Sequence, residues 1–182
     1  MRIITGCARG TKLKTPKGLG TRPTADRVKE SLFSILGARL EGARVLDLFA
    51  GTGALGLEAL SRGAESTVFV DVVTSVLIKQ NASAAKLTDK VEVIGADSLR
   101  VLRRMEQEQR RFDLIFCDPP YNQGHPANVL ALLDKGRILA DGGILILEHS
   151  RHEPVGDDDL EQLQIARREK YGETVVTFFR YK

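Results

Sequence analysis

Asp118, Pro119, Pro120 and Tyr121 follow directly on the apolar run from Phe112 to Cys117. A short apolar run is typical of a buried strand, and the two prolines prevent the chain from continuing as strand. An acid, a rigid carbonyl group and an aromatic ring are therefore held together at a strand end, where open α/β sheets bind ligands. The carboxylate and the Pro119 carbonyl can accept hydrogen bonds from an exocyclic amine, and the tyrosine ring can cover a flat base. We predict that these four residues form a catalytic site, with an ordinary turn after a strand as the alternative.

A second set of candidate residues follows an earlier apolar run over residues 43–48. Gly51, Gly53 and Gly56 form a G-x-G-x-x-G pattern at the start of a predicted helix, and Asp71 lies 20 residues beyond the first of them. The glycines allow close approach of the backbone to a ligand, and a carboxylate at this spacing binds ribose hydroxyls. The pattern predicts a nucleoside site that by itself fits NAD as well as S-adenosylmethionine (SAM).

Asp47 favours SAM, because an acid four residues before the first glycine attracts a cationic sulfonium ligand and opposes a pyrophosphate. The chain also has no room for a separate dehydrogenase substrate domain. Asp97, after a third apolar run, can accept a bond from the adenine amino group or cap the next helix. The predicted cofactor-binding residues are Asp47, Phe49, Ala50, Gly51, Gly53, Asp71, Ala96 and Asp97.

Alternating strands and helices are expected to position these residues. The predicted strands cover residues 43–48, 66–71, 90–95, 112–117 and 144–148, and the predicted helices cover 54–62, 73–87, 98–109 and 126–139. Residues 2–15 predict a hairpin, a helix is expected from Thr24 to about Gly37, and two last strands over 164–170 and 173–181 predict a terminal antiparallel pair. Such repeated units predict an α/β fold with a doubly wound, mostly parallel sheet and right-handed crossovers.

Basic residues are concentrated near the N-terminus. Residues 1–30 carry eight basic and two acidic side chains, a net charge of +6, whereas the whole chain of 182 residues carries +3. A basic segment on a slightly acidic body indicates a polyanionic partner, first of all nucleic acid, or a solvated basic face. The cations expected to meet phosphates are Arg9, Lys12, Lys14, Arg22 and Arg27, with Thr24 at the same loop. Because the glycine loop lies elsewhere in the chain, we expect loss of residues 2–15 to change SAM affinity little.

The length and composition predict a single domain in a reduced, cytoplasmic protein. No apolar stretch approaches membrane-spanning length, and the N-terminus lacks the apolar core of a signal peptide. Cys7 and Cys117 are the two cysteines, too few for a cysteine metal site. We expect no membrane association and no bound metal.

The chain resembles Rossmann-like class I SAM-dependent methyltransferases and, more narrowly, the RsmD type of small-subunit ribosomal RNA guanine-N2 methyltransferases. The resemblance rests on Arg2 to Gly6 with Arg9-Gly10, on Thr21 to Val28, on Glu30 to Leu36, on Asp47 to Ala64 and on Asp118 to Tyr121. The second-strand acid, often Glu in this family, is Asp71 here, and the shorter side chain still reaches a ribose diol.

The resemblance implies a seven-stranded sheet with an antiparallel last strand, SAM as cofactor, and methylation of one guanine in 16S rRNA. It also implies that the substrate is the small ribosomal subunit or an assembly intermediate. Residues 1–40 would form an RNA-binding extension and residues 41–182 the methyltransferase domain of a monomer. The alternatives are a DNA or RNA adenine-N6 methyltransferase, an inactive RNA-binding assembly factor, and an NAD-dependent oxidoreductase. His125 follows the catalytic set, either as a proton shuttle or as an ordinary loop histidine.

Overall fold

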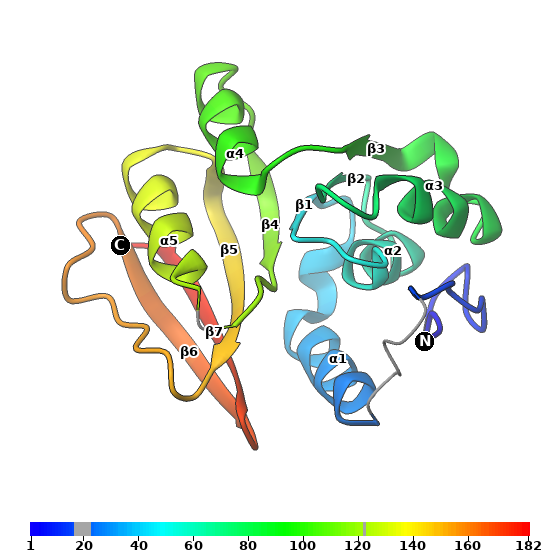
Figure 1. The fold of residues 1–182 in the computed structure, drawn as a ribbon, viewed down its shortest axis with the longest axis horizontal. Coiled ribbons are helices and arrows are strands. Elements are labelled where there is room, and N and C mark those ends of the chain that lie inside the picture. Colours follow the sequence, from blue (N-terminus) through cyan, green and yellow to red (C-terminus); the bar gives the residue numbers. More distant parts are fainter. Residues whose placement is uncertain (17–22, 122) are drawn as a thin grey trace.

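A single mixed sheet runs through the protein and carries helices on both of its faces (Figure 1). The computed structural model describes residues 1–16, 23–121 and 123–182. Within these residues the strand order is β3-β2-β1-β4-β5-β7-β6. The strands are β1 (Arg44–Leu48), β2 (Ser66–Val70), β3 (Val91–Ile94), β4 (Phe112–Cys117), β5 (Leu139–Ser150), β6 (Leu163–Tyr171) and β7 (Thr174–Tyr181).

Strands β1 to β5 pair in parallel, and β7 runs antiparallel to both of its neighbours, β5 and β6. The predicted mostly parallel, seven-stranded sheet with an antiparallel last strand is therefore confirmed. Parallel pairing brings the carboxyl ends of β1, β2, β4 and β5 to one edge, which is where the candidate residues were predicted to meet.

The helices are α1 (Pro23–Leu36), α2 (Ala54–Ser61), α3 (Ser75–Ala84), α4 (Ser98–Gln107) and α5 (His125–Lys135), with single 3-10 turns at Gly37–Leu40 and Thr88–Lys90. One hydrophobic cluster joins α1, α2 and α3 to one sheet face, and a second joins α4 and α5 to the other. Alternate residues of β4 divide between the two clusters: Phe116 packs against Phe33 of α1, with ring centroids 5.7 Å apart, and Ile115 faces the second cluster.

Several element boundaries differ from the prediction, and two of the differences occur at glycines. Helix α5 ends at Lys135 because Gly136 takes an extended conformation, so the helix ends four residues earlier than predicted. Strand β5 begins at Leu139 instead of residue 144, since Leu139 pairs with Phe112 and a bulge carries the pairing past Gly142 and Gly143. The two glycines, interpreted from sequence as a break before the strand, lie inside it.

Residues 1–16, which we name the N-terminal arm, pair with themselves only at an isolated antiparallel bridge between Arg2 and Lys12. The predicted hairpin is thus reduced to one bridge flanked by backbone bonds such as Ile3 N to Thr11 O (3.0 Å). The side chains of Ile3, Ala8 and Leu13 are buried in the same hydrophobic cluster as α2 and α3. The arm is therefore packed into the main body of the fold.

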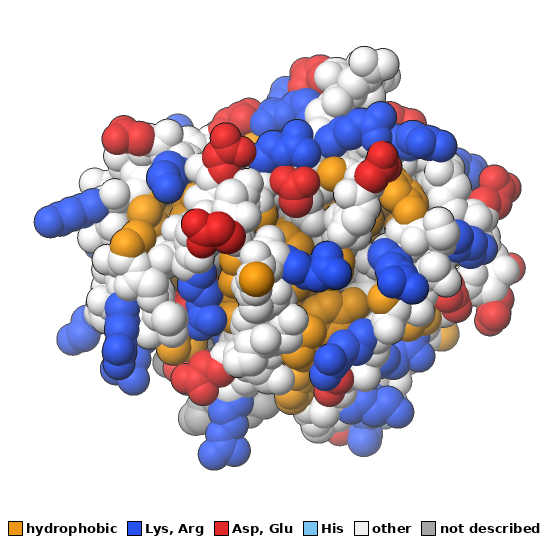
Figure 2. All heavy atoms as spheres, turned by 180° about the vertical axis from the view of Figure 1, so that it is seen from behind, with side chains coloured by type: hydrophobic (Ala, Val, Ile, Leu, Met, Phe, Trp, Pro, Cys, Tyr) orange, Lys and Arg blue, Asp and Glu red, His pale blue; other side chains and the backbone are white. Residues whose placement is uncertain are grey.

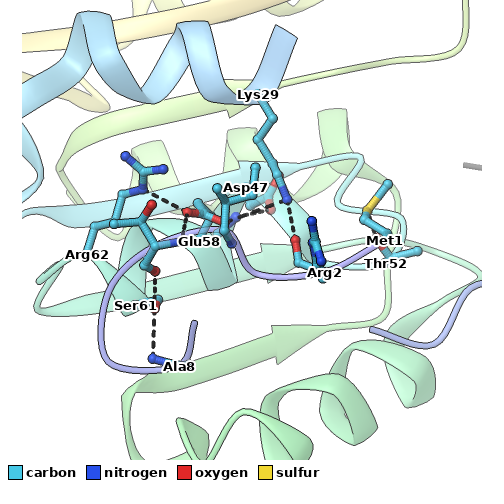
Figure 3. A network of polar contacts seen from close by, with 12 residues as sticks. Met1, Arg2, Ala8, Lys29, Asp47, Thr52, Glu58, Ser61 and Arg62 are labelled. Carbon is cyan, nitrogen blue, oxygen red and sulfur yellow. Dashed lines mark hydrogen bonds and ion pairs between the residues drawn. The ribbon is translucent and has the colours of Figure 1, made fainter. Parts of the chain in front are cut away.

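Buried polar side chains of α2 fix the arm's backbone (Figure 3). Glu58, fully buried, accepts hydrogen bonds from the N–H groups of Ile4 (2.8 Å) and Thr5 (3.0 Å) and pairs with Arg62 (2.8 Å). Ser61 accepts from Ala8 N (2.9 Å) and donates to Thr5 O (2.6 Å). A side chain at Gly6 would meet Ser61 O at 1.7 Å, so the close approach requires glycine.

Lys29 of α1 closes this buried network. Its ammonium donates to Arg2 O (2.7 Å) and lies 3.6 Å from Glu58, and only 5% of the side chain is exposed. Burial lowers the pKa of Lys29, and the nearby carboxylates of Glu58 and Asp26 act in the opposite direction. One of the eight cations counted in residues 1–30 is therefore used inside the fold.

Candidate active site

Three carboxylates converge at the carboxyl edge of the sheet. Asp47 lies within β1, Asp118 directly follows β4, and Glu148 lies in β5. Cys117 of β4 pairs with Leu147 of β5. Asp118 and Glu148 each follow one residue of this pair, so they lie beside each other on neighbouring strands. Glu148 was not singled out from the sequence, although its place at the end of a strand beside β4 is a signal that could have found it.

The environment of Asp118 favours its protonated form. Surrounding protein desolvates the carboxylate, and the negative charges of Glu148 and Asp47 add to this, so the pKa of Asp118 lies well above its usual range. By its accessible surface the residue is nevertheless exposed to solvent at the strand end. Desolvation likewise raises the pKa of Glu148. Two carboxyl groups with raised pKa values at a ligand-binding edge are typical of a site that handles protons.

Tyr121 is fixed by hydrogen bonds from its hydroxyl group. The hydroxyl donates to Glu148 Oε1 at 2.7 Å and lies 3.3 Å from Thr174 Oγ1 of β7. Desolvation and the charge of Glu148 raise the pKa of Tyr121 above its usual value. The ring is therefore held by β5 and β7 next to Asp118, and its predicted use as a platform for a base stays a prediction.

The glycine loop and Asp71 meet as predicted. Gly51 (φ 55°) and Gly53 (φ 78°) have left-handed backbones, and Gly51 N donates to Asp71 Oδ2 at 2.9 Å. Asp71 Oδ1 accepts from Val73 N and Thr74 N, each at 2.9 Å. Desolvation acts to raise the pKa of Asp71, but the bonds from Thr74, Val73 and Gly51 outweigh it and lower the pKa. The ionised carboxylate thus holds the loop and the start of α3 together.

Asp47 holds the start of α2, which directly follows the glycine loop. Only 2% of the residue is exposed, and Oδ2 accepts from Gly56 N in the first turn of α2 (2.9 Å). Desolvation raises the pKa of Asp47 to about 8, with a smaller upward contribution from Asp71. A side chain at Gly56 would lie 2.4 Å from the Phe69 ring, so the third glycine serves close packing of helix on strand.

Phe49 and His125 form an aromatic pair at the same edge, with centroids 5.1 Å apart. Phe49 has a φ of 57°, a conformation that bulky residues rarely adopt outside functional sites. His125 begins α5, and its buried Nδ1 has no hydrogen-bond partner among the described residues. Ala50 continues the loop, with its N–H bonded to Val70 O at 3.1 Å.

Asp97 caps α4, accepting from Arg100 N at 2.9 Å, and the adjacent Ala96 is half-buried. The capping role is therefore present, and a bond from an adenine amino group stays a prediction. Across the described residues no group of three or more His, Cys, Asp or Glu side chains is placed to hold a metal ion.

The predicted RNA-binding cations are surface residues wherever the structure describes them. Arg9, Lys12, Lys14 and Arg27 are exposed, whereas Arg22 and the side chain of Thr24 lie outside the described residues. Figure 2 shows one face of the molecule, on which Lys and Arg side chains are spread among acidic ones around a hydrophobic area. A hollow of about 280 Å³ beside the arm is lined by basic and acidic residues, among them Arg2, Arg9, Asp26 and Glu30.

The arm also touches the glycine loop, which corrects one expectation. Asn81 of α3 donates to Thr52 O (2.9 Å) and to Lys14 O (3.1 Å), and the Thr52 hydroxyl donates to Met1 Sδ at 3.4 Å. Distance along the chain is therefore no reason to expect an unchanged SAM affinity, because segments about fifty residues apart fold into contact.

The arrangement places the glycine loop and the Asp118-Pro119 pair at the ends of the neighbouring strands β1 and β4. Rigid acceptors, a held aromatic ring and carboxylates with raised pKa values suit transfer to a planar amine. Among the described residues, no helix is both long and apolar enough to cross a membrane.

Comparison with known proteins agrees with this geometry. The family model described as "Conserved hypothetical protein 95" matches residues 1–180. The Bacillus subtilis (strain 168) protein YlbH is 40% identical over 186 residues, covering 99% of this chain and 98% of its own. Ribosomal RNA small subunit methyltransferase D of Haemophilus influenzae is 37% identical over 158 residues, covering 85% of this chain and 81% of its own.

Solved structures are similar over the whole chain. The structure of yhhF from Escherichia coli has a TM-score of 0.83 and 30% identity, covering 100% of this chain and 98% of its own. At 18% identity, SMU.776, solved in complex with SAH, has a TM-score of 0.70 over 87% of this chain and 50% of its own, a likeness that shows the fold. The predicted relationship to the RsmD type is confirmed: the chain belongs to the family of "Conserved hypothetical protein 95" and is a methyltransferase.

Proposed function

We propose that the protein transfers a methyl group from SAM to the exocyclic N2 of one guanine in the 16S rRNA of the small ribosomal subunit or its assembly intermediate. The observation that carries the proposal is the rigid Asp118-Pro119 pair at the end of β4, beside the glycine loop of β1. The relative from Haemophilus influenzae, named a ribosomal RNA small subunit methyltransferase, supports rRNA as the substrate.

The residues at the sheet edge fit SAM. The left-handed glycines permit close backbone approach, and Asp71 uses three of about four acceptor positions, which leaves room for one ribose hydroxyl. Val72 and Val73, exposed at 69% and 82%, offer apolar surface beside Asp71 that a nucleoside would cover. Asp47, with a pKa of about 8, is neutral at pH 7, and a cationic sulfonium nearby would favour its ionised form.

When bound, SAM supplies an electrophilic methyl group on a positively charged sulfur. Asp118 and the Pro119 carbonyl would accept the two N–H bonds of the base amine and aim its nitrogen at that methyl group, so positioning is their main contribution. Transfer of that methyl group to the amine nitrogen would leave the carbon–sulfur electron pair on sulfur, and Asp118 or water would accept the proton that the amine loses. The raised pKa of Asp118 makes it a better proton acceptor. Tyr121 would support the base after it leaves its stack.

Substitution of Asp118 tests the proposal. Wild-type protein, Asp118→Ala and Asp118→Asn are incubated with labelled SAM and undermethylated small subunits, and the rRNA is analysed as nucleosides. We expect N2-methylguanosine from the wild type, none from Asp118→Ala, and residual product from Asp118→Asn, whose amide oxygen still accepts a bond. SAM binding, measured by calorimetry, should change less than about two-fold, because the partner of Asp118 is the base.

Methyl transfer by Asp118→Ala at the wild-type rate would remove Asp118 from the catalytic role. Formation of N6-methyladenosine would move the activity to the adenine-N6 class. SAM binding without any transfer to rRNA would favour the non-catalytic assembly factor. The monomeric state, the cytoplasmic location and the division of the chain at residue 40 stay predictions.

A further inference from the structure

Asn81 of α3 is a fully buried amide that joins two parts of the proposed site. Its Oδ1 accepts from Lys14 N at 2.8 Å, and its Nδ2 donates to Lys14 O (3.1 Å) and to Thr52 O (2.9 Å). Lys14 belongs to the arm, and Thr52 lies between the first two glycines of the loop. One side chain therefore forms hydrogen bonds with the arm and with the glycine loop at the same time.

Neighbouring contacts run between the same two segments. The Thr52 hydroxyl donates to Met1 Sδ at 3.4 Å, and Lys14 Nζ donates to Gln80 Oε1 at 3.0 Å, on the residue before Asn81. The cation of Lys14 remains exposed and its backbone is held by Asn81. Lys14, whose cation is exposed, is thus linked to the backbone of the glycine loop through two hydrogen bonds of Asn81.

We propose that Asn81 is a positioning residue that couples the arm to the glycine loop, so that RNA bound to the arm and SAM bound at the loop strengthen each other's binding. The inference rests on the proposed function, because it takes the arm as a contact for RNA. It adds an energetic link between substrate and cofactor that neither site requires by itself.

The physical reason is the cost of a buried amide without partners. Both donor bonds of Asn81 are satisfied only when Lys14 and Thr52 are in their places together, and a buried polar group that loses a partner is destabilised. A ligand that fixes either segment therefore favours the arrangement that the other ligand needs. Such coupling is reciprocal: RNA must change the affinity for the cofactor by the same factor as the cofactor changes the affinity for RNA.

A double titration on the full-length protein measures the coupling. SAH, used in place of SAM to prevent turnover, is titrated with and without undermethylated small subunits, and the small subunits are titrated with and without SAH. We expect each ligand to tighten the other's binding by about five-fold or more. Asn81→Ala should bring this factor close to one. The isosteric Asn81→Asp, which keeps the acceptor for Lys14 N and loses both donors, tests the same point if the alanine variant does not fold.

Ser61→Ala is the matched control. Ser61 also anchors the arm, through Ala8 N and Thr5 O, and the described structure shows no bond from it to the glycine loop. This variant should keep the coupling factor of the wild type, which separates coupling from mere loosening of the arm.

Independent binding of SAH and rRNA to the wild type would overturn the inference and leave the proposed function standing. A folded Asn81 variant with the full coupling factor would overturn the role of Asn81. Failure of the wild type to bind undermethylated small subunits at all would instead count against the proposed function on which the inference rests.

Discussion

At the scale of single residues, the site is defined by carboxylates whose ionisation the fold controls. Asp71 is held ionised by backbone N–H groups, whereas desolvation raises the pKa values of Asp47, Asp118 and Glu148. The sequence identified Asp47, Asp71 and Asp118, because each lies in or directly after an apolar run. It did not identify Glu148, whose strand was predicted but whose bond to Tyr121 depends on the pairing of β5 with β4.

Glu148→Gln tests this electrostatic link. The glutamine keeps an oxygen for the Tyr121 hydroxyl and removes a negative charge that raises the pKa of Asp118, so that pKa falls. Since the ionised Asp118 accepts the amine, the acidic limb of the kcat/KM profile should move to lower pH. The measurement is methyl transfer against pH.

Glu173→Gln is the control for Glu148→Gln, because Glu173 is an exposed carboxylate that pairs with Arg151. It should leave the acidic limb in place. An unchanged limb in Glu148→Gln would mean that Glu148 does not act on the ionisation of Asp118.

At the scale of elements, the sequence pattern predicted the strands that carry the site. It was less accurate for the element boundaries that depend on glycine. Strand β4 has the predicted bounds, because an apolar run ending in two prolines leaves no alternative. Helix α3 begins two residues later than predicted, since Asp71 binds the N–H groups of Val73 and Thr74 outside the helix. The early start of β5 depends on pairing across the bulge at Gly142, which periodicity along one segment does not contain.

The junction of β1 with α2 yields a pH-dependent prediction, because Asp47 bonds Gly56 N there. Folding raises the pKa of Asp47 from 3.8 to about 8. Between these values the folded state retains a proton that the unfolded state has released, so this group's contribution to stability falls as pH rises. The slope is at most about 1.4 kcal/mol per pH unit.

Asp47→Asn keeps an oxygen for Gly56 N and removes the titration. The free energy of unfolding of this variant, relative to the wild type, should therefore increase from pH 5 to pH 8 in urea denaturation. A difference that stays constant over this range would show that Asp47 ionises normally in the folded protein.

At the scale of the whole molecule, the structure changes the meaning of the basic N-terminal segment. The sequence predicted its charge and its distance along the chain from the cofactor loop. In the fold the two are in contact, because Asn81 bonds both of them and the Thr52 hydroxyl bonds Met1. Glu58, Ser61 and Asn81 bind the arm across 53 to 67 residues of chain. Contacts of that range depend on the tertiary fold, and local patterns do not encode them. Deletion of residues 2–15 would remove Ile3 and Leu13 from the core as well as charge from the surface.

Point substitutions therefore test the surface role of the arm better than deletion. Among the described residues, no hydrogen bond or ion pair involves the side chains of Arg9 or Lys12, and both are exposed. The double variant Arg9→Ala/Lys12→Ala should raise KM for the small subunit and flatten the salt dependence of binding by about one unit of slope per lost phosphate contact. SAM affinity and the melting temperature should stay unchanged.

Arg103→Ala is the matched control for the arm variant, because Arg103 is an exposed arginine on α4, across the sheet from the arm. It should leave KM and the salt slope unchanged. If the arm variant keeps the wild-type salt slope, its cations do not meet phosphate.

The position of the arm in the chain has a consequence for biosynthesis. A ribosome makes residues 1–16 before it makes α2 and α3, so Glu58, Ser61 and Asn81 do not yet exist when the arm emerges. Until residue 81 has been translated, Ile3 and Leu13 lack their full burial site, and the basic side chains move with an undocked segment. Domains fold as units during synthesis. The arm can therefore dock only after the residues of α2 and α3 that bind it have been translated.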